Sequence, residues 1–409
     1  MSEKKAMYGL PEEVKFCKKC VISNQRPSST VEFKSHKDQV KQVIGFNSDG
    51  ICSACEYADV KDLGIDWEKR DSSLRELLSK FKKNDGSYDV IVPGSGGKDS
   101  AYTSHILKYK YGMNPLTVTW APHLYTDIGW KNFQNWMHVG GLDNMLYTPN
   151  GKLHKEMTKN AFHNLLHPFQ PFIVGQRIIG PMMAKRFGVK LVMYGENQAE
   201  YGNAIEENED PMMKFDFFSN ESVDDLKFGG LKIQEYINTG RYVIGDFAPY
   251  IAPKKADLLS SGVEVHYLGY YLKWDPQECY YYSVDNTGFE SNPQRTEGSY
   301  SKYSSIDDKI DPFHYYTTLI KFGIGRATYD AAQEVRNDKI TREEAVNLVK
   351  KYDTEFPSKY FKEFLDYIDT SEEQFWNTIE RFRSPHLWGK TIEGKWGLRH
   401  TVSMDGLND

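Results

Sequence analysis

The sequence lacks the features that would assign the chain to a membrane, a secretory route or a nucleic acid. Its 409 residues contain no apolar run of the roughly 18 residues that a membrane-spanning helix needs. The opening MSEKKAMYGLPEEVKF has no apolar core of a secretory signal. A net charge of −6 leaves no excess of Lys and Arg for a polyphosphate groove. We therefore expect a cytoplasmic protein that binds neither a membrane nor a nucleic acid.

Cysteine is scarce, and four of the five cysteines form two Cys-x-x-Cys pairs, Cys17 with Cys20 and Cys52 with Cys55. Two such knuckles bring four thiolates to one tetrahedral centre, which predicts a closed, structural zinc site. Two disulfides or an iron–sulfur centre are the alternatives, and disulfides do not suit a cytosolic chain. Cys279 stands alone and is interpreted as a buried free thiol.

Apolar and amphipathic segments alternate between residues 88 and 195. Strands are predicted at 88–92, 115–120, 143–148 and 189–195, and helices at 99–111, 128–141, 152–166 and 175–188. This rhythm predicts an α/β fold with a doubly wound, mostly parallel sheet, whose ligands bind at the carboxyl ends of the strands. Three regions follow: a zinc-knuckle arm at 1–60, the α/β domain at 61–250, and a Tyr-rich, helical C-terminal region at 251–409 with a capping box at Thr341 and Glu344.

A glycine-rich loop, PGSGGKDS at 93–100, follows the first predicted strand. It is neither a Walker loop, because Asp follows the Lys, nor a dinucleotide fingerprint, because the third glycine is missing. Two glycines and a helix N-terminus expose backbone N–H groups to an anion, and an acidic side chain can hold magnesium against a polyphosphate. The predicted phosphate-binding residues are Ser95, Gly96, Gly97, Lys98, Asp99 and Ser100, with Asp99 as the Mg²⁺ ligand.

This loop resembles the SGGxDS loop of the N-type ATP pyrophosphatases, which include GMP, NAD and asparagine synthetases and tRNA-thiolating enzymes. The resemblance implies that ATP is cleaved to AMP and pyrophosphate and that the AMP is placed on a carbonyl-type oxygen. Ammonia or sulfur then displaces that oxygen.

The chain as a whole looks like the N-acetyl sugar amidotransferase family of bacterial surface-polysaccharide pathways. The motifs that carry this resemblance are the two Cys pairs, PGSGGKDS, MYGEN at 193–197, YLGYYLKWDP at 267–276, and the long run at 310–357 that begins IDPFHYYTTLIKFGIGRATYD. The resemblance implies that a sugar acetamido group is activated with ATP and becomes an acetamidino group. It also implies that a separate glutaminase, similar to that of imidazole-glycerol-phosphate synthase, supplies the ammonia.

Site residues follow from the strand ends and from this resemblance. Glu196 and Asn197, after the fourth predicted strand, are expected to meet the acetamido group or the amine, with Lys98 and Asp99 as further catalytic residues. Further candidate ATP contacts are Val118, Trp120 and Gly195. Arg326 is the candidate for a sugar-linked phosphate or carboxylate, with an ordinary helix salt bridge as the alternative. His163 and His167, four residues apart, are interpreted as polar-face residues rather than metal ligands.

The chain has no glutaminase nucleophile of its own, because no Gly-x-Cys-x-Gly occurs and no Cys follows Met1. Ammonia is therefore expected from a partner, and the N-acetylated sugar is the expected substrate. The main alternative is a tRNA-thiolating enzyme, which would need a basic face and usually a Cys pair in the α/β domain, yet residues 85–205 contain no cysteine. A non-catalytic docking protein and a homo-oligomer are further hypotheses.

Overall fold

The computed structural model describes residues 5–28, 30, 32–36, 39–201 and 210–403. At its centre lies a parallel sheet of five strands in the order β3-β2-β1-β4-β7. Its strands are β1 (Val90–Pro93), β2 (Pro115–Trp120), β3 (Asp143–Tyr147), β4 (Leu191–Tyr194) and β7 (Glu264–Tyr267). The strand order reverses between β1 and β4, which is the doubly wound arrangement, so the predicted fold class is confirmed.

Burial explains why the strands could be predicted from the sequence. Every residue of β1 and β2 is buried, and parallel strands covered on both faces read as continuous apolar runs. β3 forms one edge of the sheet and is largely exposed. The four predicted strands are all present in the structure.

The fifth strand, β7, lies beyond residue 250, where the α/β domain was predicted to end. It pairs with β4 from Leu191 opposite Glu264 to Tyr194 opposite Tyr267. Between β4 and β7 the described residues form only short elements, which are η2 (Gln198–Tyr201), η4 (Phe215–Phe217), η5 (Val223–Asp225), β5 (Lys227–Phe228), β6 (Leu231–Lys232), α7 (Ile233–Ile237), η6 (Ile244–Tyr250) and α8 (Lys255–Ser261). These elements interrupt the strand–helix rhythm, so the sequence pattern does not reveal β7.

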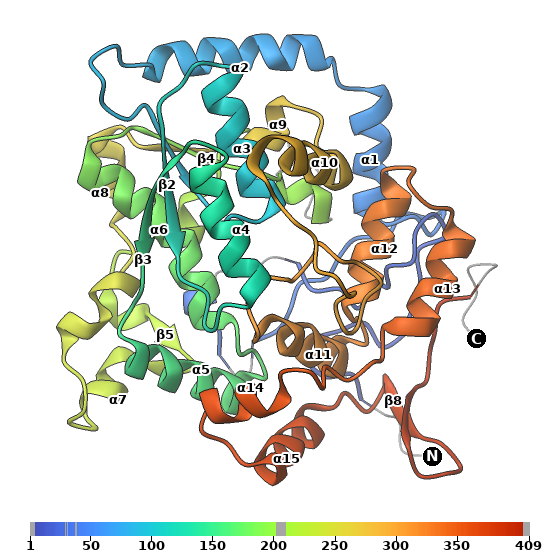
Figure 1. Cartoon of the computed structure of the whole chain (residues 1–409). Helices are drawn as coiled ribbons and strands as arrows, with labels where there is room; N and C mark the ends of the chain where they lie inside the picture. Colours follow the sequence, from blue (N-terminus) through green and yellow to red (C-terminus); the bar gives the residue numbers. More distant parts are fainter. Residues whose placement is uncertain (1–4, 29, 31, 37–38, 202–209, 404–409) are drawn as a thin grey trace.

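Helices cover both faces of the sheet (Figure 1). One side carries α3 (Lys98–Tyr109), with α4 (Asp127–His138) and α10 (Pro276–Thr287) packed outside it. α6 (Gln170–Phe187) covers the other side and contacts β1, β2 and β4, with α5 (Gly151–Leu165) beside it. α6 begins five residues before the predicted start, because Pro171 is tolerated in the first turn of a helix.

The C-terminal region is helical, as predicted. Besides α8, β7 and α10, its elements are α9 (Leu268–Tyr271), α11 (Asp311–Phe322), α12 (Arg326–Arg336), α13 (Arg342–Tyr352), α14 (Phe361–Tyr367), α15 (Glu372–Phe382) and the hairpin β8 (Trp388–Lys390) and β9 (Trp396–Leu398). The predicted capping box of Thr341 and Glu344 opens α13. Among the described residues, no helix combines the length and apolar character needed to cross a bilayer.

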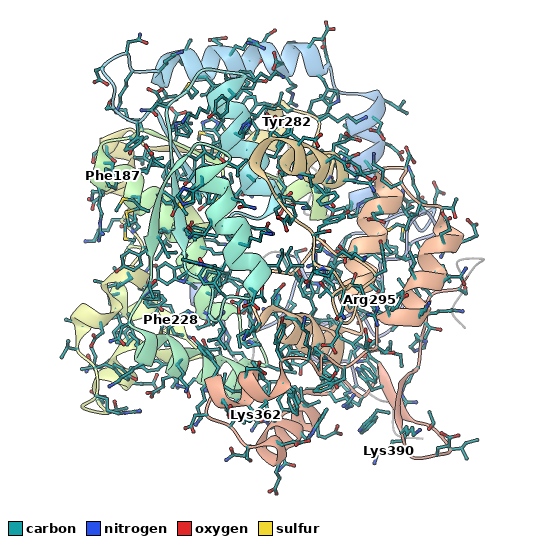
Figure 2. All side chains as sticks on the ribbon, viewed as in Figure 1. Phe187, Phe228, Tyr282, Arg295, Lys362 and Lys390 are labelled. Carbon is teal, nitrogen blue, oxygen red and sulfur yellow. The ribbon has the colours of Figure 1, made fainter. Side chains whose placement is uncertain are left out.

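A single large core joins the C-terminal helices to the sheet. It runs from α6 and the β-strands through Phe228 to Phe313 and Phe364, which are all fully buried. Figure 2 shows Phe228 inside the protein, whereas Lys362 projects outward from α14. Shared burial of this kind fixes the C-terminal helices against the α/β unit, so a cavity between the two has firm walls.

The N-terminal arm carries η1 (Glu32–Lys34) and α1 (Ser53–Leu63), and α2 (Trp67–Phe81) follows it. Figure 1 shows the dark blue arm beside the orange helices α12 and α13. The four paired cysteines form one buried cluster with Ala331, Val335 and Val346 of these helices. Arg342 of α13 donates hydrogen bonds to the carbonyl oxygens of Cys17 and Cys20. The arm therefore supports α12 and α13 from outside.

A buried ion pair ties the arm to the strand ends. Lys61 of α1 lies 3.1 Å from Glu200 of η2, and the two side chains are 1% and 2% exposed. Lys61 also donates to the carbonyl of Trp274 at 3.1 Å and to Oδ1 of Asn337 at 2.9 Å. Arg336 of α12 donates to the carbonyl of Glu200 at 3.0 Å. One lysine thus links the arm, the β4 turn, the start of α10 and the end of α12.

Lys61→Met should lower the free energy of unfolding by about 3–5 kcal/mol, because it leaves Glu200 buried without its countercharge. Chemical denaturation at neutral pH measures the change. The matched control is Lys273→Met, which removes an exposed lysine paired with Asp62 at 2.7 Å and should cost at most about 1 kcal/mol. Equal losses for the two variants would show that the buried Lys61–Glu200 pair contributes no more to the free energy of unfolding than an exposed ion pair does.

Candidate active site

The loop between β1 and α3 requires glycine at two positions, at Gly96 because of its backbone conformation and at Gly94 because of close packing. Gly96 has φ +83°, and a Cβ there would lie 2.9 Å from the Cα of Phe133. A Cβ on Gly94 would lie 2.1 Å from the Cβ of Ser100. The tight turn brings the loop against the N-terminus of α3, which begins at Lys98. The backbone N–H groups at this end can therefore meet an anion.

The polar side chains of the loop hold one another in place. Ser100 accepts a hydrogen bond from the N–H of Gly96 at 3.3 Å and donates to the carbonyl of Gly97 at 3.1 Å. Lys98 lies 2.6 Å from Oδ2 of Asp99. Burial would lower the pKa of Lys98, but Asp99 and Glu196 outweigh it and raise that pKa, so the lysine stays cationic.

Asp99 retains an oxygen that can bind a cation. Its Oδ1 is buried and has no hydrogen-bond partner among the described residues. A buried carboxylate oxygen of this kind is the ligand type that Mg²⁺ prefers, and it stands at the mouth of an anion cradle. The residues present therefore fit the predicted magnesium ion.

One cavity, here called the strand-end cavity, opens at the carboxyl ends of β1, β2 and β4 and has a volume of about 380 Å³. Its walls bring together predicted residues from three separate segments, namely Ser95, Gly97, Asp99, Ser100, Val118, Trp120, Gly195 and Glu196. Nε1 of Trp120 is buried and has no hydrogen-bond partner among the described residues. The cavity lies at the point where the strand order reverses, which is where nucleotides bind in folds of this class.

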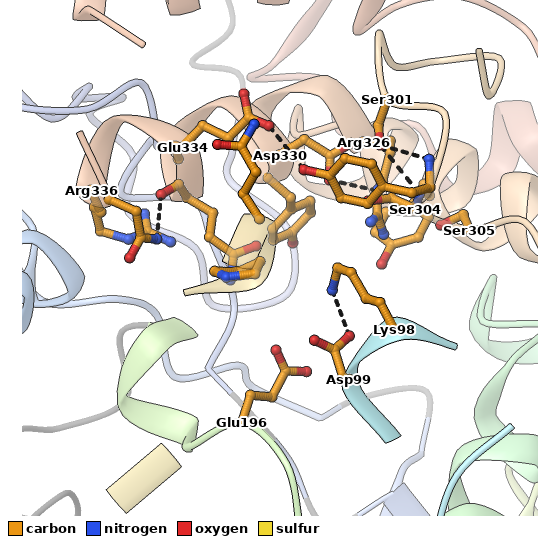
Figure 3. A pocket seen from close by; sticks show the side chains of 18 of the residues that line it. Lys98, Asp99, Glu196, Ser301, Ser304, Ser305, Arg326, Asp330, Glu334 and Arg336 are labelled. Atoms are coloured by element: carbon orange, nitrogen blue, oxygen red, sulfur yellow. Dashed lines mark hydrogen bonds and ion pairs between the residues drawn. The ribbon is translucent and has the colours of Figure 1, made fainter. Parts of the chain in front are cut away.

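A second cavity, the central cavity, adjoins the strand-end cavity and measures about 520 Å³. Lys98, Asp99 and Glu196 form one wall, and α12 forms the wall opposite (Figure 3). Asp99 and Glu196 line both cavities. A group transferred from one ligand to another would therefore pass between these two carboxylates.

The α12 wall presents charged side chains at helical spacing. Arg326 pairs with Asp330 at 3.0 Å and lies over the ring of Tyr315 at 4.4 Å. Glu334, one turn further on, accepts a hydrogen bond from Tyr300 at 2.8 Å. Arg326 thus makes the helix salt bridge that was the alternative interpretation, and it also lines the central cavity.

A third and smaller cavity of about 180 Å³ connects the loop to the C-terminal region. Gly96, Gly97, Asp307 and Arg326 all line it. The Ser95 hydroxyl bonds to the Asp307 carboxylate, and burial raises the pKa of Asp307. Arg326 therefore lies within the same space as the backbone of the phosphate loop.

Asn197 lies away from these three cavities. It is 2% exposed, and its Oδ1 accepts a hydrogen bond from the N–H of Ala199 at 3.2 Å. Both residues lie in the turn after β4, where Glu196 lines two of the cavities and Asn197 lines none of them. The contact of Asn197 with Ala199 shapes the turn into η2.

The four paired cysteines form the single cluster that their spacing predicted. All are buried, and their sulfur atoms lie within 4.8 Å of one another. Sγ of Cys17 is 3.9 Å from that of Cys55, and Sγ of Cys20 is 3.8 Å from that of Cys52, so none is in a disulfide. A Zn–S bond of about 2.3 Å places two thiolates of a tetrahedral site about 3.8 Å apart. The cluster therefore fits a single tetrahedral ion.

The remaining candidates have structural partners. His163 bonds to Thr378 at 2.9 Å and Thr370 at 3.0 Å, and His167 pairs with Glu32 at 3.1 Å. Cys279 is 2% exposed, and burial raises the pKa of its thiol. These contacts agree with the interpretation of the histidines as non-ligands and of the cysteine as a buried thiol.

Several cavity residues were absent from the sequence predictions. They are Gln176, Asp275, Asp307, Asp311, His314, Asp330 and Glu334. Arg326, Asp330 and Glu334 are spaced four residues apart, so a polar stripe on one helix was the available signal. The others come from segments that only the tertiary fold brings to the loop.

Comparison with known proteins gives partial matches. An uncharacterized protein of Methanocaldococcus jannaschii is 34% identical over 83 residues, which are 20% of this chain and 29% of that protein, so the match spans less than a third of the relative. An NH3-dependent NAD synthetase of Campylobacter jejuni has 17% identity and a TM-score of 0.26, and the match covers 32% of this chain and 56% of that one.

Two further solved structures overlap more of the chain. An NMN synthetase of Francisella tularensis has 13% identity and a TM-score of 0.28 over 71% of this chain and 93% of that one. A U34-tRNA thiolase of Methanococcus maripaludis has 12% identity and a TM-score of 0.31 over 83% of this chain and 89% of that one. Residues 297–401, which contain the α12 wall, match the family model described as "LPS biosynthesis protein WbpG-like, C-terminal domain".

Proposed function

We propose that this chain is an ATP-dependent amidotransferase that converts the acetamido group of an N-acetylated sugar into an acetamidino group. The reaction releases AMP and pyrophosphate and serves the synthesis of a surface glycan. The observation that carries the proposal is the position of Asp99 and Glu196, which line both the strand-end cavity and the central cavity. The match of residues 297–401 to a lipopolysaccharide biosynthesis domain supports a glycan substrate.

In this proposal the strand-end cavity holds ATP. The loop N–H groups, Ser95 and Ser100 bind the β- and γ-phosphates, and Trp120 offers its free N–H to the nucleoside. Lys98, on the wall of the central cavity, adds positive charge beside the loop. A magnesium ion held by Asp99 would neutralise charge on the polyphosphate. The sugar would bind in the central cavity, which shares Asp99 and Glu196 with the strand-end cavity.

The chemistry needs two displacements. The acetamido oxygen attacks the α-phosphorus and pyrophosphate leaves, which gives an O-adenylated imidate that keeps the amide N–H proton and is therefore cationic. Ammonia then attacks the imidate carbon, a C–N bond forms, and AMP leaves with the former amide oxygen. An amide is unreactive to ammonia near neutral pH, so holding the sugar and ATP together and turning the oxygen into a good leaving group are the main contributions of the site.

The central cavity favours a sugar over a tRNA. Its lining contains seven carboxylates, namely Asp99, Glu196, Asp275, Asp307, Asp311, Asp330 and Glu334, and five cations, namely Arg26, Lys98, Arg326, Arg336 and Lys339. Carboxylates accept hydrogen bonds from sugar hydroxyls, and their excess over the cations does not suit the many phosphates of a nucleic-acid backbone. Arg326 is the proposed partner for a phosphate or carboxylate on the sugar.

Ammonia is proposed to come from a separate glutaminase, because the sequence contains no Gly-x-Cys-x-Gly nucleophile motif. The purified chain should therefore use ammonium but not glutamine. Near neutral pH only about one per cent of ammonium is free ammonia if its pKa is about 9, between the α-amino and lysine values, so high ammonium and mildly alkaline pH should help.

The test incubates the chain with ATP, Mg²⁺ and ammonium, together with either UDP- and CMP-linked N-acetyl sugars or bulk tRNA, and follows pyrophosphate release. We expect release with a sugar, and a sugar product one mass unit lighter, since NH replaces oxygen. Glutamine should replace ammonium only when the partner glutaminase is added. Release that depends on tRNA, with sulfur gained on the tRNA, would instead identify a thiolating enzyme.

A further inference from the structure

Asp311 stands at the entrance to α11, on the wall of the central cavity. His314 and Thr318, one and two turns further along the same helix, line the cavity as well. Protein surrounds the Asp311 carboxyl, yet its side chain is only half-buried because it opens into the cavity. A small molecule in the cavity can therefore reach it.

The surroundings of Asp311 suit a group that exchanges a proton near neutral pH. Burial raises its pKa to about 7, although the charge of Arg326 on α12 opposes the rise. Asp307 and Asp308, on the preceding segment, add to the rise. His314, on the same helix, is half-buried, and desolvation lowers its pKa, so it stays neutral. A carboxyl with a pKa near the working pH is an efficient proton acceptor.

The other carboxylates of the central cavity have stronger partners. Asp330 pairs with Arg326, Glu334 accepts from two tyrosines, Asp275 caps α10 and pairs with Lys339, and Asp307 accepts from Ser95. Asp99 is paired with Lys98 and is the proposed magnesium ligand. Glu196 interacts with Lys98 at the nucleotide end. Asp311 is therefore the cavity carboxylate that is best placed to change its charge.

The ammonium nitrogen must lose two protons during the second displacement. Ammonium carries four protons, and its nitrogen keeps two in the amidinium product. One proton must leave before or while the nitrogen attacks, because a protonated amine has no free electron pair. The other leaves from the tetrahedral adduct with AMP, whose phosphate oxygens accept it. A site that works near neutral pH therefore needs a base for the first proton.

We propose that Asp311 accepts the proton that ammonium loses as its nitrogen attacks the adenylated acetamido carbon. This inference rests on the proposed amidotransferase function. Arg326 attracts the carboxyl, and the cavity lining holds seven carboxylates against five cations, which favours the entry of a small cation such as ammonium. The proton returns to solvent after AMP and the product leave.

The test compares wild type with Asp311→Asn, using as nucleophile either ammonium or hydroxylamine, an amine that is largely unprotonated at neutral pH. Asp311→Asn should lower the ammonium-dependent rate of amidine formation by about 10²-fold, the usual contribution of a general base. It should leave the hydroxylamine-dependent rate within a few-fold of wild type, because that amine needs no prior deprotonation. A purely structural defect would lower both rates together.

The pH profile of wild type gives a readout that does not depend on the variant. Only the ionised carboxyl accepts a proton, so the ammonium-dependent rate should fall as pH drops through about 7. Above that pH it should level off, whereas Asp311→Asn should keep rising with free ammonia toward a pH of about 9. Asp285→Asn, on the exposed face of α10, is the matched control and should behave as wild type.

The outcomes separate the two proposals. If wild type forms no amidine from any N-acetylated sugar, the proposed function fails and this inference with it. If wild type forms amidine and Asp311→Asn keeps its ammonium-dependent rate, only the role of Asp311 is overturned. Equal losses with ammonium and hydroxylamine, or a wild-type rate that follows free ammonia without a plateau, would overturn that role as well.

Discussion

Asp99→Ala is expected to lower pyrophosphate formation by about 10³-fold, the loss typical when a preorganised charge at a transferring group is removed. The Oδ1 atom of Asp99 has no hydrogen-bond partner among the described residues, so its lone pairs are available to coordinate a metal ion. The side chain is 34% exposed and does not form part of the core. The fold should therefore survive the change, and only the chemistry should be lost.

Asp99→Asn separates charge from shape in the same experiment. The amide keeps the size of the side chain but provides a much weaker magnesium ligand, so we expect a loss close to that of the alanine variant. Phosphate release is followed with a coupled pyrophosphatase in the presence of the sugar and ammonium. Asp285→Asn changes an exposed carboxylate of α10 and should retain full turnover. Near-normal turnover of Asp99→Ala would mean that this loop does not bind the nucleotide.

The phosphate loop could be found in the sequence because its chemistry is local. Its backbone groups, glycines and helix N-terminus come from eight consecutive residues, and the apolar run of β1 marks where the loop begins. The strand ends could be placed for a similar reason, since parallel strands end at one edge of a sheet. This reasoning brought Val118, Trp120 and Gly195 to the loop, and the strand-end cavity contains all three.

The opposite wall of the site could not be placed in this way. Arg326 and Asp311 reach the loop only because the C-terminal helices share a core with the sheet. No local pattern states which face of α12 turns toward the loop, or that α11 begins at its edge. Asn197 shows the same limit on a smaller scale, because the sequence after a strand does not reveal which of two neighbouring polar side chains lines a cavity.

The cysteine cluster could be predicted from the sequence, but its place in the fold could not. The spacing of two Cys-x-x-Cys pairs predicted that four thiolates meet, and they do. The sequence did not indicate that the cluster would pack against α12 and α13, which lie near the other end of the chain. Arg336 of α12 also interacts electrostatically with Cys20, Cys52 and Cys55. The cluster therefore packs against α12, the helix that carries Arg326.

Cys17→Ser is therefore expected to affect both the arm and the site. The binding free energy of a structural zinc ion is on the order of 10 kcal/mol, and in a small metal-nucleated unit it becomes folding free energy. Losing one of four thiolates should release the ion and unfold the arm. Without the arm, α12 loses the apolar support of the cysteine cluster, so turnover with the sugar should fall although Arg326 and the loop are unchanged.

Metal analysis and thermal unfolding of the purified protein measure these effects. Wild type should contain about one zinc ion per chain, as expected for a single site of four cysteine thiolates. Cys17→Ser should contain none and should melt at lower temperature. The matched control is Cys279→Ala, which removes a buried thiol outside the cluster and should keep the metal. Iron with visible absorption in place of zinc would identify an iron–sulfur centre. A stable, metal-free and fully active Cys17→Ser would show that the four thiolates support neither the arm nor the α12 wall.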